Sequence, residues 1–360
     1  MGNRCDYSKV SVKTSSLEYN DDNDNDNDND SDSDDDDKKI NDSLFLSVMN
    51  NNSYISLKIL EYLEKNVCPE NFNKIINYTD FYFNIEKSSI LLYASENKMK
   101  LLLTKLLYDL PNRNICHIDI YGNTLLLSTC LNQLSSNTLC ILNNVERCNL
   151  SYVNNYGETA LTISCQLYNE DIIMKILEYP EKCNMGCMTK EIKSEEIKSI
   201  DRKYYEKYRV YYEKYGFRWS SFNETALILS CKYKLNKSAL KMLDYPNLCN
   251  IYAISSTYSN SVYNYKKYTS LVWACENNLD EVALKILNYP QEEFYKRLDL
   301  YQGAFEHACK NNMETVVIKF MDESNKLLII NSNVLYWFNK NKMDNAINFY
   351  IKLSFDNDIL

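Results

Sequence analysis

Apolar residues recur along this chain at one fixed spacing. Counting from Thr159, Leu follows after two positions, a small residue after five, Cys after six, an aliphatic pair after seventeen and eighteen, and Tyr-Pro after twenty and twenty-one. The same spacing starts at Thr225 and at Thr269. Such intervals place the apolar side chains on one helix face, and the proline stops a second helix. Each unit therefore predicts a pair of helices.

Weaker copies of this spacing extend the pattern over most of the chain. The threonine hydroxyl at the start of a unit can cap the first helix. Eight units result, and their anchor positions are Asp42, Ser89, Thr124, Thr159, Thr225, Thr269, Gly303 and Ser332. The pattern predicts an all-α repeat domain over residues 40–354, with 355–360 as a C-terminal end.

The interval from Thr159 to Thr225 is twice 33 residues, so a hidden repeat is one alternative. Its anchor would be Ile192, but Ile197 and Lys198 then stand where the other units have a small residue and a cysteine. We favour a charged, Tyr-rich insert at 187–218. Its interspersed glutamates favour a solvated helix with local ion pairs over a surface that stacks nucleic-acid bases.

Charge is concentrated at the N-terminus. Residues 1–39 carry thirteen acidic and five basic side chains, a net charge of −8 out of −9 for the chain. Such a segment cannot bury enough apolar surface to fold, and we expect a disordered acidic tail. The other residues lack the basic excess that neutralises phosphates, so no nucleic-acid partner is expected.

Composition argues against catalysis. Six glycines and two histidines leave little material for phosphate-binding loops or histidine-based sites, so we expect no enzyme and no cofactor. Eight of the thirteen cysteines occupy recurring repeat positions, which predicts buried free thiols and no metal site. No apolar run reaches a membrane span, and no signal peptide is recognisable, so we expect a cytoplasmic protein without membrane contact.

Two turns suggest a family. In residues 119–123 and 154–158, Asp or Asn opens the turn and Gly occupies the position that favours a positive φ. With the threonine-led helix and the period near 33, this pattern resembles the ankyrin repeat, whose signature is Thr-Pro-Leu-His-x-Ala. The Tyr-rich and Asn-rich usage further resembles the ankyrin-repeat proteins of giant DNA viruses of the mimivirus type.

Departures from the signature are also present. Its proline is replaced by Ala160, Ala226 or Ser270, and the turn glycine by Asn223 in one unit and Lys267 in another. The resemblance implies an ankyrin-repeat solenoid of about eight helix pairs with short β-turn or hairpin arms. A generic helical repeat is the alternative.

The resemblance also implies a function. An ankyrin solenoid binds another protein on its concave face, and we expect a monomer that does so in the cytoplasm, of a host cell if the protein is viral. A substrate adaptor for a host ubiquitin ligase, or a virion or scaffold component, are alternatives. By the resemblance, the partner contacts are turn residues before each anchor and exposed residues seven and eight positions after it. They are Tyr121, Asn123, Leu131, Asn132, Tyr156, Glu158, Gln166, Phe222, Glu224, Lys232, Tyr233, Tyr268, Glu276 and Asn277.

Overall fold

The computed structural model describes the second of two units, Ser43–Leu360, apart from several short gaps. The described residues are 43–44, 46–48, 50–66, 81–83, 86–108, 115–119, 121–190, 221–258, 265–290, 292–323 and 328–356. The expected acidic tail, most of the expected insert and the last four residues lie outside this part of the chain.

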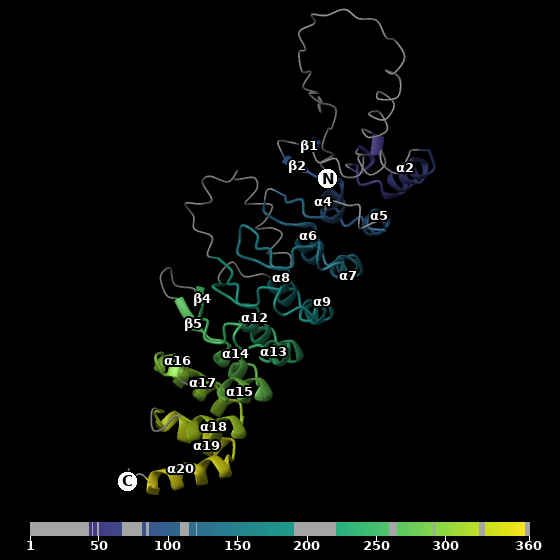
Figure 1. Cartoon of the computed structure of the whole chain (residues 1–360). Helices are drawn as coiled ribbons and strands as arrows, with labels where there is room; N and C mark the ends of the chain where they lie inside the picture. The colour runs from purple at the N-terminus through teal and green to yellow at the C-terminus, as the bar shows by residue number, and fades with distance from the viewer. Residues whose placement is uncertain are drawn as a thin grey trace, which may run out of the picture. The chain divides into compact units, whose positions relative to one another are not determined.

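Helices dominate the described residues, and most of them form consecutive pairs (Figure 1). The first helices of the pairs are α4 (Ile90–Glu96), α6 (Leu125–Leu131), α8 (Ala160–Gln166), α12 (Ala226–Lys232), α14 (Ser270–Glu276), α17 (Leu298–Lys310) and α19 (Ser332–Lys340). The second helices are α5 (Lys100–Leu106), α7 (Ser135–Leu142), α9 (Glu170–Ile176), α13 (Asn236–Met242), α15 (Asp280–Leu287), α18 (Glu314–Glu323) and α20 (Asp344–Asp356). A further helix, α2 (Ser53–Asn66), packs on α5, and the short α16 (Glu292–Tyr295) precedes α17.

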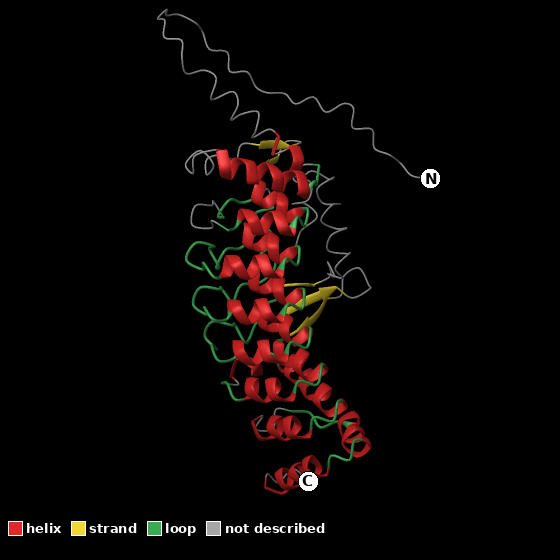
Figure 2. Ribbon diagram, turned by 90° about the vertical axis from the view of Figure 1, so that its right-hand side faces the viewer, coloured by secondary structure: helices red, strands yellow, loops and turns green. Residues whose placement is uncertain are grey.

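The pairs stack through like helices. Each first helix packs on the next first helix, from α4 through α6, α8, α12, α14 and α17 to α19. The second helices likewise stack on one another from α5 to α20, and α2 packs on the first of them (Figure 1). Figure 2 shows the stacked helices from another side. In particular α8 contacts α12 and α9 contacts α13, although 59 residues lie between the two helices of each contact in the chain. The two pairs therefore pack directly on each other.

Strands occur only in short arms beside the first helices, within the described residues. A two-stranded antiparallel sheet joins β1 (Phe81–Phe83) to β2 (Glu86–Ser88). A three-stranded antiparallel sheet has the order β3-β4-β5, from Ser221–Phe222, Ser255–Tyr258 and Tyr265–Tyr268. Lys267, which the sequence placed at a turn-glycine position, lies inside β5 because the hairpin here is longer.

The expected hydroxyl caps are present in five units. Each anchor side chain accepts a hydrogen bond from the backbone N–H three residues on, which satisfies one of the free donors at the helix start. These caps are Ser89, Thr124, Thr159, Thr225 and Thr269. The cap of α19 is Asn331, one residue before the expected anchor Ser332.

The anchor expected at Gly303 does not start a helix. Gly303 lies in the middle of α17, which begins at Leu298. The buried side chains of Tyr301, Ala304 and Phe305 continue the apolar face of this helix toward its N-terminus. Because α16 and the first turn of α17 occupy this stretch, no β arm forms there among the described residues.

The recurring cysteines are buried as expected. Cys165, Cys231, Cys275 and Cys309 are each 0% exposed, and they are free thiols. Adjacent first helices approach closely through small polar groups, since the Cys165 thiol lies 3.4 Å from the Ser230 hydroxyl. This contact joins neighbouring repeats where the sequence pattern required a small residue.

Candidate protein interface

Three arms after the β1–β2 hairpin are numbered in chain order. The first of them, residues 119–123, is closed by the carboxylate of Asp119. One of its oxygens accepts hydrogen bonds from the backbone N–H of Tyr121 at 2.8 Å and of Asn123 at 2.7 Å. The other accepts from the Asn123 amide at 3.0 Å. Gly122 takes φ +74° and Gly157 in the next arm takes φ +75°, which confirms the positive-φ role expected for both.

The second arm repeats this geometry and bonds to the first. Asn154 accepts from the backbone N–H of Tyr156 and of Glu158, both at 2.9 Å. Its amide donates to Glu158 at 2.9 Å and across the arms to Asn123 at 3.0 Å. All four polar side chains that form this ladder, Asp119, Asn123, Asn154 and Glu158, are less than a tenth exposed. The ladder fixes two arms relative to each other.

The third arm is split by a long stretch of chain. Thr189 takes the role of Asn154, because its N–H donates to the Glu224 carbonyl at 3.1 Å and its hydroxyl accepts from the Glu224 N–H at 3.0 Å. The backbone N–H of Lys190 in turn donates to the Tyr156 carbonyl at 2.9 Å. In the earlier arms the two bonded residues are four positions apart, and here they are 35 apart. Residues 187–190, which the sequence assigned to the insert, thus include part of the arm.

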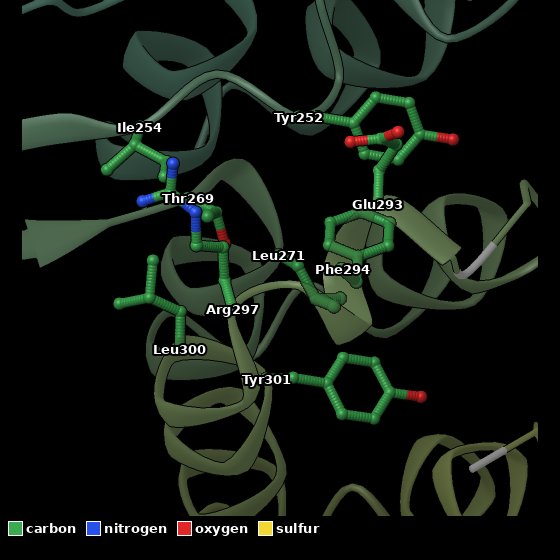
Figure 3. A pocket seen from close by; sticks show the side chains of 9 residues that line it. All are labelled: Tyr252, Ile254, Thr269, Leu271, Glu293, Phe294, Arg297, Leu300 and Tyr301. Atoms are coloured by element: carbon green, nitrogen blue, oxygen red, sulfur yellow. The ribbon is translucent and has the colours of Figure 1, made fainter.

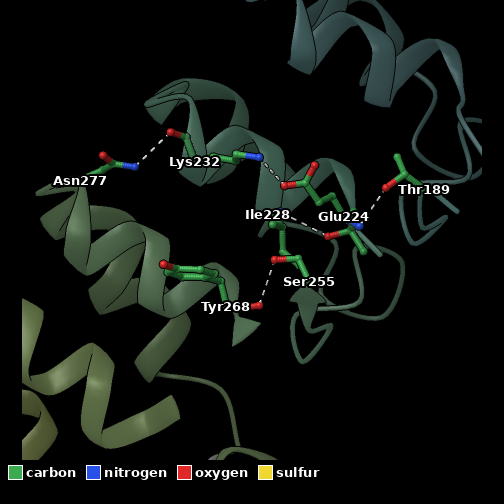
Figure 4. Close-up of polar contacts among 8 residues, drawn as sticks. Thr189, Glu224, Ile228, Lys232, Ser255, Tyr268 and Asn277 are labelled. Atoms are coloured by element: carbon green, nitrogen blue, oxygen red, sulfur yellow. Dashed lines mark hydrogen bonds and ion pairs between the residues drawn. The ribbon is translucent and has the colours of Figure 1, made fainter. Parts of the chain in front are cut away.

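Behind this arm a buried ion pair joins Glu224 to the end of α12 (Figure 4). The Lys232 ammonium lies 2.6 Å from the Glu224 carboxylate, and the two side chains are 13% and 5% exposed. Burial raises the pKa of Glu224, and the Lys232 charge opposes that shift. The lysine head is therefore held in place by a partner from its own repeat.

Aromatic rings surround the same lysine. We name Tyr168, Tyr233, Tyr268 and Trp273 the aromatic cluster. The Lys232 ammonium lies 5.3 Å from the ring centroid of Tyr233 and 5.9 Å from that of Trp273, within cation–π range.

The cluster consists of two ring pairs, which the Lys232 ammonium joins. Tyr168 meets Tyr233 edge-on with centroids 4.8 Å apart, and Tyr268 stacks on Trp273 at 4.4 Å. Tyr168 is 57% exposed, and the other three rings are half-buried. The cluster therefore offers rigid, partly exposed aromatic surface that spans the repeats anchored at Thr159, Thr225 and Thr269.

The structure divides the predicted contact residues into two groups. The buried residues are Tyr121, Asn123, Leu131, Asn132, Glu158, Gln166 and Glu224. The residues with accessible surface are Tyr156, Phe222, Lys232, Tyr233, Tyr268, Glu276 and Asn277.

Several of the buried residues have internal roles that explain their burial. Asn123, Glu158 and Glu224 bond within the arms, as described above. The expectation that Leu131, Asn132 and Gln166 are exposed is wrong, because the last turn of α6 and of α8 is covered; Asn132, for example, donates to the Ser128 carbonyl.

Asn277 is another predicted contact with a structural role. Its amide donates to the carbonyls of Cys231 at 3.0 Å and of Lys232 at 3.1 Å, at the C-terminal end of the preceding first helix (Figure 4). Asn311 and Asn341 make the same contacts with the helices before them. Asparagine thus caps the neighbouring repeat, a role that the sequence pattern did not indicate.

Two members of the aromatic cluster were missed by the sequence analysis. Trp273 lies inside α14, where neighbouring repeats have Ile163 and Leu229, and Tyr168 lies in a left-handed turn at φ +58°. The arm openers were also missed as a set. Asp119, Asn154, Thr189 and Ser255 each follow an anchor by 30 positions, and this recurrence was the available signal.

A small cavity lies beside the longer hairpin (Figure 3). Tyr252 and Ile254 line one side, and Phe294, Arg297 and Tyr301 line the other. Its volume is about 10 Å³, which is room for one water molecule and not for an organic cofactor.

Neither a cluster of metal ligands nor a helix fit to cross a membrane occurs in the described part of the chain. No group of three or more His, Cys, Asp or Glu residues is placed to hold a metal ion there. None of the described helices combines the length and apolar character needed to cross a bilayer.

The fold defines a mostly helical repeat protein with polar arms. No protein-family model matches the chain, and no curated protein does. Its structure is similar to the ankyrin repeat domain of Bcl-3, with a TM-score of 0.38 and 15% identity over 68% of this chain and 82% of that one. The human ASB11 ankyrin repeat domain gives a TM-score of 0.38 and 14% identity over 70% and 96%. At these scores the likeness carries no weight for function.

Proposed function

We propose that this chain is an ankyrin-type interaction module that binds another protein and has no catalysis of its own. The binding surface is formed by the arms and first helices of the central repeats. The aromatic cluster is the observation that carries the proposal, since tyrosine and tryptophan are the residues that most often anchor protein interfaces.

Rigidity of this surface supports the proposal. The arm ladder fixes the residues next to Tyr156, and the Glu224–Lys232 pair fixes the cation beneath the rings. A surface that is already ordered loses little entropy when a partner binds. Burial, with the charges of Glu158 and Asp119, raises the pKa of Tyr156, so its phenol stays protonated.

The indole N–H of Trp273 adds a specific requirement. It has no hydrogen-bond acceptor among the described residues, although it is shielded from solvent. A buried donor without an acceptor is costly, and a carbonyl or carboxylate oxygen from a partner would relieve that cost. We therefore expect a partner that combines apolar contact with an acceptor oxygen at this position.

Capture by the immobilised full chain tests the proposal. Proteins retained from an extract of expressing cells are quantified by mass spectrometry for the wild type and for Tyr156→Ala/Phe222→Ala/Tyr233→Ala. Truncating an interface anchor costs about 2 kcal/mol, or roughly thirtyfold in affinity, so specific partners should be lost from the triple variant.

The matched control is Tyr54→Ala/Tyr62→Ala, which removes two exposed tyrosines from α2, far along the chain. It should retain the same proteins as the wild type, and circular dichroism should show equal helicity for all three. If the triple variant retains every protein that the wild type retains, the surface is not the interface.

A further inference from the structure

β5 is the edge strand of the three-stranded sheet, and no strand among the described residues pairs with its outer side. β5 pairs with β4 from Ser255↔Tyr268 to Tyr258↔Tyr265 and ends the three-stranded sheet. In the described part of the chain, β5 receives hydrogen bonds only from β4, including one from the Ser255 hydroxyl to the Tyr268 carbonyl at 3.2 Å. An edge strand in this state can accept an added strand.

The next repeat explains why no described strand pairs with this edge. A repeat with its own β arm could place a strand or turn beside β5, as the second arm does beside the first through the bond from Asn155 to the Tyr121 carbonyl. After β5 and α14–α15, the chain forms α16 and the lengthened α17 in place of an arm. The edge therefore lies where the regular series of arms ends.

Two lysines determine which strand can pair there. Lys266 and Lys267 are both exposed, and neither forms an ion pair with any residue that the structure describes. Consecutive strand residues point to opposite faces of a sheet, so both faces beside the edge carry a positive charge. Burial, with the charge of Glu276, raises the pKa of Tyr268 at the strand's end.

Lysine at an edge repels a strand of like charge and favours an acidic one. Opposite charges directly across a strand pair are stabilising, whereas like charges are destabilising. A segment with two consecutive acidic residues would place one carboxylate beside each lysine. β-branched residues on either side would favour the extended conformation.

We propose that β5 is a docking edge for an extended acidic peptide segment of a partner protein, which adds a fourth strand to the β3-β4-β5 sheet. The proposal rests on the interaction function proposed above and specifies its chemistry. Tyr268 ends β5 and stacks on Trp273, so the added strand runs to the aromatic cluster and its acceptor-deficient indole. A nucleic-acid strand would satisfy the lysines and not the alternating N–H and C=O groups of the edge.

Fluorescence anisotropy with the full chain and defined peptides tests this inference. The probe is a labelled, end-capped peptide of sequence Thr-Val-Glu-Glu-Val-Thr. Lys266→Glu/Lys267→Glu should weaken its binding at least tenfold, and that variant should instead bind Thr-Val-Lys-Lys-Val-Thr. The matched control is Lys342→Glu/Lys352→Glu, which reverses two exposed lysines in the last repeat and should bind the acidic probe like the wild type.

A second pair of measurements tests the backbone pairing. Two peptides are N-methylated at complementary alternate nitrogens, and the one methylated on the set that faces β5 should lose binding. Hydrogen exchange should slow at outward-facing amides within residues 265–268 when the unmodified peptide is bound. Binding that survives methylation of each set in turn, or that does not change on lysine reversal, would overturn the inference. So would tighter, lysine-dependent binding of a single-stranded oligonucleotide.

The peptide measurements and the capture experiment together distinguish failure of this inference from failure of the proposed function. If the acidic peptide does not bind while the Tyr156, Phe222 and Tyr233 variant loses its captured proteins, the β5 edge is wrong and the interaction module stands. If the peptide binds at β5 and the triple variant captures normally, recognition occurs at the edge and the surface proposed above is wrong.

Discussion

At the scale of single residues, the same amino acid has different roles in different arms and helices. Gly157 has φ +75°, and a Cβ there would come within 2.8 Å of the Lys190 backbone nitrogen. Gly303 lies inside α17, where a Cβ would meet no atom within 4 Å. The first glycine is required by backbone conformation and close packing, and the second is a weak point in a helix.

Alanine substitutions at these glycines should therefore have opposite effects. Gly303→Ala should stabilise the chain by about 1 kcal/mol, because alanine loses less backbone entropy in a helix. Gly157→Ala should destabilise it by roughly 1–3 kcal/mol through strain at positive φ. Urea denaturation followed by circular dichroism measures both; equal shifts in the same direction would contradict the assignment.

The buried thiols predict a loss of stability in alkaline solution. Burial raises the pKa of Cys165 to about 12, with the Ser230 hydroxyl opposing the shift. In the unfolded chain a thiol has a pKa of about 8.5, so between these values the folded state binds more protons. The stabilisation that comes from this raised pKa is fully present below the pKa of the unfolded chain. It is lost as pH rises toward the pKa of the folded chain.

Comparing Cys165→Ala with the wild type isolates this effect. The wild type should lose about 2 kcal/mol more stability than the variant between pH 8 and pH 10, because one fewer thiol ionises on unfolding in the variant. Urea denaturation at the two pH values gives the difference. If the difference in unfolding free energy between the two proteins did not change with pH, Cys165 would be ionised or solvated in the folded chain.

At the scale of elements, each first helix depends on its neighbours for its C-terminal end. The last carbonyl groups of a helix receive no hydrogen bond from within the helix. For α12, α14 and α17, an asparagine side chain from the following repeat donates to them. The Thr caps at the other ends are local, whereas these asparagine contacts cross between repeats. They therefore couple the stability of adjacent pairs.

Asn277→Ala should cost about 1–2 kcal/mol of unfolding free energy, since it leaves the half-buried carbonyls of Cys231 and Lys232 without their donor. Asn288→Ala is the control, because Asn288 is an exposed asparagine at the end of α15. Thermal and urea unfolding of both variants checks the expectation. Equal stability of the two variants would show that the contacts across repeats contribute nothing measurable.

At the scale of the whole molecule, stability should come from stacking between neighbouring pairs. Direct packing of α8 on α12 and of α9 on α13 continues the stack past residues 191–220. Thr189 and Glu224 also close the base of the third arm independently of what lies between them.

Replacing residues 191–220 by a short Gly/Ser linker should therefore keep one cooperative unfolding transition with a midpoint within a few degrees of the wild type. The closure entropy changes only slowly with the number of connecting residues, so a shorter connection should not destabilise the arm. Differential scanning calorimetry checks this. Two separated transitions would mean that the segment supports the stack between these repeats.

The sequence alone determined the features that are local or strictly periodic. The Thr caps depend on backbone donors three residues away, the positive φ of Gly122 and Gly157 depends on their own turns, and the buried cysteines follow the repeat period. Each of these could be predicted because its cause lies within one repeat.

Only the tertiary structure decided how one repeat uses the residues of another. Asn123, Glu158 and Glu224 have the polar character of surface residues, and they are buried because the arms bond to one another or to a lysine. Trp273 joins Tyr268 and Lys232 because neighbouring first helices pack side by side. Gly303 falls inside a helix because α17 extends its apolar face where an arm would otherwise form. These outcomes depend on contacts between repeats, which no spacing within a single repeat can specify.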